Sequence, residues 1–163
     1  LRWCAMVLKI DFKKLLKNLA IPLAVGLVSG FLTRGGVEEY SQNAVKPFFT
    51  PPDWVFPVAW TVLYILMGIA SYFIDVADTP ESKKRAQTFY YAQLFFNFCW
   101  SFIFFGMEAY LFAFVWIVVM WVLIIATTLE FYKIDKRAAY LMIPYIIWVT
   151  FAAVLNFSVY LLN

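Results

Sequence analysis

The sequence contains no histidine and only two cysteines among its 163 residues. Histidine is the commonest metal ligand, the commonest general base and a frequent ligand of haem iron. Its absence argues against a histidine metal centre and against a hydrolase of the usual kind, so we predict no metal site and no required cofactor. Cys4 lies near one end of the chain and Cys99 lies in a long apolar run, so we expect no disulfide between them.

Charged residues are also scarce, at 14% of the chain, whereas 64% of the residues are hydrophobic and 21% are aromatic. A typical soluble domain has about 25% charged and about 45–50% apolar residues. Five runs carry no charge: Asn18–Thr33, Trp54–Ile74, Ala86–Met107, Ala109–Leu129 and Ala138–Asn163. A helix needs about 20 apolar residues to cross a bilayer. Four runs provide them outright, and the first does so once Leu15 and Leu16 are added and Lys17 and Arg34 extend to the membrane surface.

The predicted fold is therefore an all-α integral membrane protein, a five-transmembrane-helix bundle with spans at about 15–33, 54–74, 86–107, 109–129 and 138–162. The runs do not alternate between apolar and polar residues as the strands of a membrane barrel do. Residues 1–17 form a basic amphipathic N-terminal segment, either a helix lying on the membrane surface or a basic flank that orients the first span. Residues 18–163 form the membrane domain.

Positive charges are divided unevenly between the two sides of such a bundle. Eleven share the side of the N-terminus: Arg2, Lys9, Lys13, Lys14, Lys17, Lys83, Lys84, Arg85, Lys133, Lys136 and Arg137. Only Arg34 and Lys46 lie on the other side. Because cytoplasmic segments carry the excess of lysine and arginine, we predict a cytoplasmic N-terminus and a C-terminus outside. Membrane topology then explains the net charge of +3, and nucleic acid is not an expected partner.

The connection between the first two spans, Arg34 to Asp53, is about 20 residues long, and loops of that length are often lids or binding segments. Its "TPPD" sequence fits a helix start in which Thr50 is the N-cap and Asp53 lies in the first turn. Pro57 then falls inside the second span and should bend it, as Pro144 should bend the fifth.

Polar and aromatic residues recur at helical spacing on three spans. They are Gln93, Asn97, Trp100 and Ser101 on the third; Trp60, Tyr64 and Ser71 on the second; and Tyr145, Trp148, Ala152 and Asn156 on the fifth. One interpretation is that these groups join the helices by hydrogen bonds inside the membrane. The other is that they line a pocket for a flat hydrophobic ligand, on which tryptophan would stack and which a carboxamide would orient.

Other features narrow the range of functions. No charged residue lies in mid-span, which argues against a proton-coupled pump, and no nucleophile lies beside a base. Gly26-x-x-x-Gly30 permits close packing of helices, within the chain or between two copies. Three further tryptophans, Trp54, Trp116 and Trp121, are expected at the membrane interface or facing lipid.

Three segments carry a family resemblance: "KPFFTPPDWVFPVAWTVLYILMG", "QLFFNFCWSFIFFG" and "LMIPYIIWVTFAAVLN". Together with five spans, they closely resemble the translocator protein family, whose bacterial members are called tryptophan-rich sensory proteins (TspO/MBR). The resemblance implies a five-helix bundle of the bacterial plasma membrane, often a homodimer, in contact with membrane lipid. It also implies binding of porphyrins such as protoporphyrin IX and haem, and of synthetic isoquinoline or benzodiazepine ligands.

The family's pocket positions correspond here to Trp60, Asn97, Trp100, Trp148 and Ala152, and the spacing adds Tyr64 and Gln93 as ligand-binding candidates. The resemblance also presents the first connection as a lid. Two departures matter. Tyr40 and Ser41 stand where many members have a Trp-Tyr pair. Tyr160 lacks the following basic residue of the animal cholesterol motif, so sterol binding is not predicted.

The leading hypothesis is thus a membrane receptor or sensor that binds porphyrin or haem in a tryptophan-rich pocket inside the bundle. One alternative is an enzyme for light- and oxygen-dependent porphyrin breakdown, with Trp60 and Trp148 as the candidate catalytic residues. Another is a carrier that moves porphyrin across the membrane. The propionates of a porphyrin are costly to bury without cations. Arg34 and Lys46 are therefore candidates to pair with them, unless both only anchor helix ends.

Overall fold

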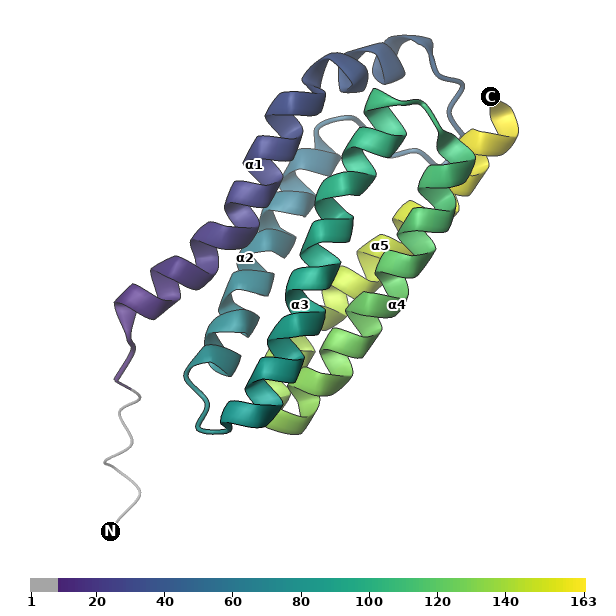
Figure 1. The fold of residues 1–163 in the computed structure, drawn as a ribbon. Coiled ribbons are helices and arrows are strands. Elements are labelled where there is room, and N and C mark those ends of the chain that lie inside the picture. The colour runs from purple at the N-terminus through teal and green to yellow at the C-terminus, as the bar shows by residue number, and fades with distance from the viewer. Residues whose placement is uncertain (1–8) are drawn as a thin grey trace.

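The computed structural model describes residues 9–163. It contains five α-helices and one π-helix: α1 (Phe12–Asn43), α2 (Val55–Asp75), α3 (Pro80–Ser101), η1 (Phe102–Gly106), α4 (Tyr110–Ile134) and α5 (Lys136–Leu162). The five helices run lengthwise beside one another in a single bundle (Figure 1). The all-helical prediction is confirmed for these residues. Residues 1–8, about half of the predicted N-terminal segment, lie outside the described residues.

The helices close into a ring in the order α1, α2, α5, α4, α3, in which α3 packs back against α1 and also contacts α2. Buried methionines and β-branched residues fill the centre, among them Met67, Ile117, Met142 and Val149. Gly26 lies directly against the ring of Tyr64, where a Cβ would clash, whereas Gly30 faces open space. One half of the glycine motif therefore serves packing within the chain.

Four helices are long and apolar enough to cross a membrane: α1, α2, α4 and α5. The predicted third span is not among them, so five α-helices are established but five transmembrane helices are not. Two features of the sequence account for this. The first turns of α3 are "PESKKR", and its apolar residues continue past Ser101 into η1, where the α-helical hydrogen-bond pattern changes.

The predicted long loop from Arg34 to Asp53 is wrong, because α1 continues to Asn43, nine residues beyond Arg34. The two glycines at 35 and 36 lower helix propensity, but packing overrides them. Gly36 lies directly against the carbonyl of Phe105, where a side chain would clash, and the Tyr40 ring lies 5.5 Å from the Phe105 ring. This last part of α1 passes over one end of the bundle (Figure 1).

The predicted cap of the second helix is also wrong. The helix begins at Val55, and the Thr50 hydroxyl instead donates to the Pro47 carbonyl oxygen at 2.7 Å. Asp53 accepts a hydrogen bond from Ser41 at 2.7 Å. Pro57 therefore lies in the first turn, where backbone amides have no helical partner, so the predicted bend there loses its cause. Pro144 does lie inside α5, and its bend stays a prediction.

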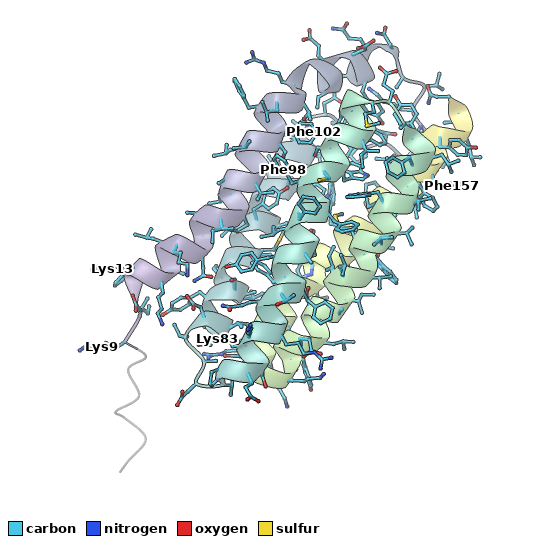
Figure 2. The ribbon with its side chains drawn as sticks, in the orientation of Figure 1. Lys9, Lys13, Lys83, Phe98, Phe102 and Phe157 are labelled. Atoms are coloured by element: carbon cyan, nitrogen blue, oxygen red, sulfur yellow. The ribbon has the colours of Figure 1, made fainter. Side chains whose placement is uncertain are left out.

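The two ends of the bundle differ in charge. The start of α1, the α2–α3 connection and the α4–α5 turn share one end, the lower end in Figure 1. Lys9, Lys13 and Lys83 mark this end in Figure 2. Arg34 lies on the part of α1 toward the other end, and Lys46 lies in the connection between α1 and α2. The structure thus keeps the predicted separation of cations, while the direction of insertion stays a prediction.

Candidate functional site

Five aromatic side chains meet where α2 and α5 lie beneath the connection 44–54. We call Phe49, Phe56, Trp60, Trp148 and Phe151 the aromatic cluster. Ring centroids are 6.3 Å apart for Trp60 and Trp148 and 5.9 Å for Phe56 and Trp148. Phe151 lies 5.5 Å from Trp148 and 6.3 Å from Phe49. These separations are within the range of favourable aromatic contacts.

Helical spacing explains why these residues meet. Phe56 and Trp60 are four residues apart on α2, and Trp148 and Phe151 are three apart on α5, so each pair shares one helix face. Phe49 is the member that the connection between α1 and α2 contributes. The connection therefore covers the cluster by at least one direct ring contact, with Phe151.

A buried hydrogen-bond network lies next to the cluster and joins α2, α3 and α5. The hydroxyl of Tyr64 donates to Asn97 Oδ1 at 2.6 Å, and Asn97 Nδ2 donates to the Tyr145 hydroxyl at 2.8 Å. Tyr145 in turn donates to Gln93 Oε1 at 2.7 Å. Trp60 connects cluster and network, because its ring stacks on Tyr64 with the centroids 5.7 Å apart.

The network gives partners to both carboxamides among the predicted ligand-binding residues, Asn97 and Gln93. Gln93 Nε2 also lies 3.8 Å from the Met67 sulfur. Each of the two amides both donates and accepts across helices, and such buried bonds hold helices in one arrangement. Joining helices is therefore enough to explain both Asn97 and Gln93. Ser101, from the same predicted stripe, is only half-buried at the end of α3.

Trp100 belongs to a second aromatic group, formed by α3, η1 and α4. Its indole N–H donates to Asn156 Oδ1 at 3.1 Å, and its ring stacks on Phe104 at 5.0 Å. Asn156 also donates to the Tyr110 carbonyl oxygen at 2.8 Å. Ala152 is buried midway between Trp148 and Asn156 on α5. These three residues, four apart, form a line along α5 between the two aromatic groups.

The indole N–H of Trp148 is buried and has no hydrogen-bond partner among residues 9–163. Other indoles are satisfied: Trp116 donates to the Phe96 carbonyl oxygen and Trp121 to the Thr150 hydroxyl, each at 2.8 Å. Leaving a buried donor unsatisfied costs about 1–3 kcal/mol. The cluster therefore presents one free donor to any acceptor group that enters it.

The three tryptophans expected near lipid differ in their surroundings. Trp54, just before α2, is 67% exposed, as expected. Trp116 and Trp121 are half-buried, and their N–H groups join α4 to α3 and α5 respectively. These two half-buried residues therefore join helices through their N–H groups.

The two candidate propionate partners differ as well. The Lys46 ammonium lies 5.3 Å from the centre of the Tyr40 ring and donates to the Ser41 carbonyl oxygen at 2.8 Å. Lys46 shares the connection with Phe49. Arg34 is exposed on α1, and its guanidinium lies 4.5 Å over the ring of Phe31 on the same helix. Lys46 is thus the cation on the segment that covers the cluster.

Sequence reasoning missed three members of the aromatic cluster. Phe56 and Phe151 could have been found from their helical spacing to Trp60 and Trp148. Nothing in the sequence placed Phe49 against α5. The rings pack on one another, so a flat ligand must displace some of them. A hollow of about 310 Å³ lies elsewhere, between α4 and α5, lined in part by Phe114, Trp121, Thr150 and Phe157; Phe157 is labelled in Figure 2.

The fold and this site define a helical membrane protein with an interior rich in aromatic side chains and carboxamides. Residues 18–162 match the model of the TspO/MBR family, and the chain belongs to that family. The resemblance inferred from the three sequence segments is thereby confirmed.

Relatives match most of this chain. It is 39% identical over 150 residues to the tryptophan-rich protein TspO of Archaeoglobus fulgidus, covering 92% of this chain and 97% of the relative. It is 44% identical over 126 residues to the tryptophan-rich sensory protein of Cereibacter sphaeroides, covering 77% and 78%. It is 32% identical over 145 residues to the translocator protein of Homo sapiens, covering 88% and 85%.

Proposed function

We propose that the protein is a membrane receptor or sensor that binds a porphyrin or haem at the aromatic cluster. The observation that carries this proposal is the unpartnered indole N–H of Trp148. The rings of Trp60 and Trp148 supply flat apolar surfaces for a conjugated macrocycle. The free N–H supplies one directed hydrogen bond to a carbonyl or carboxylate, which is the usual composition of a small-molecule site.

Binding requires the cluster to open, because its own rings occupy the space. Four of its members stand on α2 and α5, and Phe49 stands on the connection 44–54. We therefore propose that this connection moves aside and that the macrocycle takes the place of Phe49 against Phe151 and reaches Trp148 beside it. The propionates then lie toward Lys46, on the same connection, with Arg34 as the other cation of that end.

The test is a titration with protoporphyrin IX, followed by the absorbance of the bound ligand in detergent-solubilised full-length protein. Each lost aromatic stacking partner costs about 1–3 kcal/mol, so Trp60→Ala with Trp148→Ala should weaken binding at least about thirtyfold. Tyr132→Ala is the matched control, because Tyr132 is exposed on the last turn of α4. Unchanged affinity in the folded double variant would show that both tryptophans only pack.

A second candidate function has its own supporting observation. Trp60 contacts Trp148, Tyr64 and Tyr145, with ring centroids 6.3, 5.7 and 6.3 Å apart. Such a set of oxidisable rings favours light- and oxygen-dependent porphyrin breakdown. A new product spectrum on illumination, lost in Trp60→Phe with Trp148→Phe, would identify an enzyme. If the porphyrin spectrum is lost at the same rate in the parent protein and in the double variant, the protein only binds the porphyrin and the light bleaches it.

A further inference from the structure

One side chain, that of Asn163, hydrogen-bonds the connection 44–54 to the end of α5. Asn163, the residue that follows α5, accepts a hydrogen bond from the Val45 N–H on Oδ1 at 3.0 Å. Its Nδ2 donates to the Val45 carbonyl oxygen at 2.9 Å. The amide thus engages both backbone groups of a single residue, as a neighbouring strand would do.

The same amide is anchored to its own helix. Nδ2 also donates to the Val159 carbonyl oxygen at 2.8 Å, which accepts the backbone N–H of Asn163 as well, at 3.1 Å. A carboxamide has two donor hydrogens and an acceptor oxygen, and all of them are engaged. The side chain is therefore fixed against α5 while it holds Val45.

Val45 lies at a position where hydrogen bonds from α5 can restrain the connection 44–54. It is the second residue after α1, and Phe49 lies four residues later over Phe151 of α5. Two other polar contacts of the connection, Ser41 with Asp53 and Lys46 with the Ser41 carbonyl, tie it to α1 instead. Asn163 ties it to the helix that carries Trp148 and Phe151.

We propose that Asn163 is a latch that holds the connection 44–54 closed over the aromatic cluster and so limits how fast ligand enters and leaves. The claim about ligand entry and exit rests on the proposed function. The claim that Asn163 holds the connection closed does not. Asn163 is a positioning residue, because it acts through Val45 and Phe49.

The latch itself is tested without ligand, by amide hydrogen exchange on the full chain. One net hydrogen bond changes an opening equilibrium by about twofold to tenfold. Loss of the two bonds to Val45 should therefore raise exchange across 44–54 about tenfold in Asn163→Ala. Asn163→Asp puts a carboxylate oxygen, which only accepts, where Nδ2 faces the Val45 and Val159 carbonyl oxygens, so it should raise exchange at least as much. Asn43→Ala is the matched control, an exposed asparagine at the end of α1 with no side-chain hydrogen bond among residues 9–163.

Ligand kinetics test the consequence. In Asn163→Ala, association and dissociation of protoporphyrin IX should both accelerate severalfold, while Asn43→Ala should match the parent protein. Increased exchange confined to 159–162 would mean that Asn163 only caps α5, and would overturn the latch. Faster exchange across 44–54 with unchanged association and dissociation rates would show that Asn163 does not limit ligand entry and exit. If the parent protein binds no protoporphyrin, the proposed function fails, and the exchange result alone decides the latch.

Discussion

At the scale of single residues, Trp148 is the most informative side chain, because its buried N–H is unsatisfied. Trp148→Phe keeps most of the ring and removes the donor. In the free protein this relieves a desolvation cost of about 1–3 kcal/mol, so the midpoint of thermal unfolding should hold or rise. Protoporphyrin affinity should nevertheless fall about fivefold, for one lost hydrogen bond of about 1 kcal/mol.

Trp121→Phe is the control for that prediction, because it breaks the bond to Thr150. It should lower the thermal midpoint and leave protoporphyrin affinity unchanged. If Trp148→Phe instead lowers the thermal midpoint and leaves protoporphyrin affinity unchanged, the Trp148 N–H stabilises the fold and does not bind the ligand. Absorbance titrations and thermal unfolding of the three proteins decide between these results.

At the scale of elements, α3 packs mainly against α4, and the buried hydrogen-bond network joins it to α2 and α5 as well. Asn97→Leu leaves the hydroxyls of Tyr64 and Tyr145 without their amide partner. We expect the free energy of unfolding to fall by about 1–3 kcal/mol. Ser101→Ala, on the same helix but only half-buried, should change it little. Equal effects of the two substitutions would show that the network contributes no specific stability.

The elements also show what could be predicted from sequence. Each of the five uncharged runs lies largely within one of the five helices, and four of these helices are apolar over the roughly 20 residues that a membrane span needs. The extension of α1 was missed, because it depends on the contact of Gly36 with Phe105, residues far apart in the chain. The predicted Thr50 cap is wrong for a similar reason, because the helix begins only at Val55. The "TPPD" pattern is local, whereas Asp53 accepts its hydrogen bond from Ser41 of α1, 12 residues earlier.

At the scale of the whole molecule, the segregation of cations predicts the direction of insertion. Ser82 is exposed in the first turn of α3 at the cation-rich end, and Phe48 is 100% exposed in the connection between α1 and α2. In a background with Cys4→Ser and Cys99→Ser, Phe48→Cys should react with an impermeant thiol reagent in intact cells. Ser82→Cys should react only after the membrane is opened. The reverse pattern would invert the predicted topology.

Porphyrin binding in the aromatic cluster is tested most directly by photo-oxidation in place. Protoporphyrin IX bound to the full-length protein is illuminated briefly, and oxidised residues are mapped by mass spectrometry. Trp60 and Trp148 should be oxidised first, and an excess of haem should suppress their oxidation. Trp121, which lines the hollow between α4 and α5, should be oxidised more slowly. Early oxidation of Trp121, with Trp60 and Trp148 intact, would place the porphyrin on the outer hollow and contradict binding in the cluster.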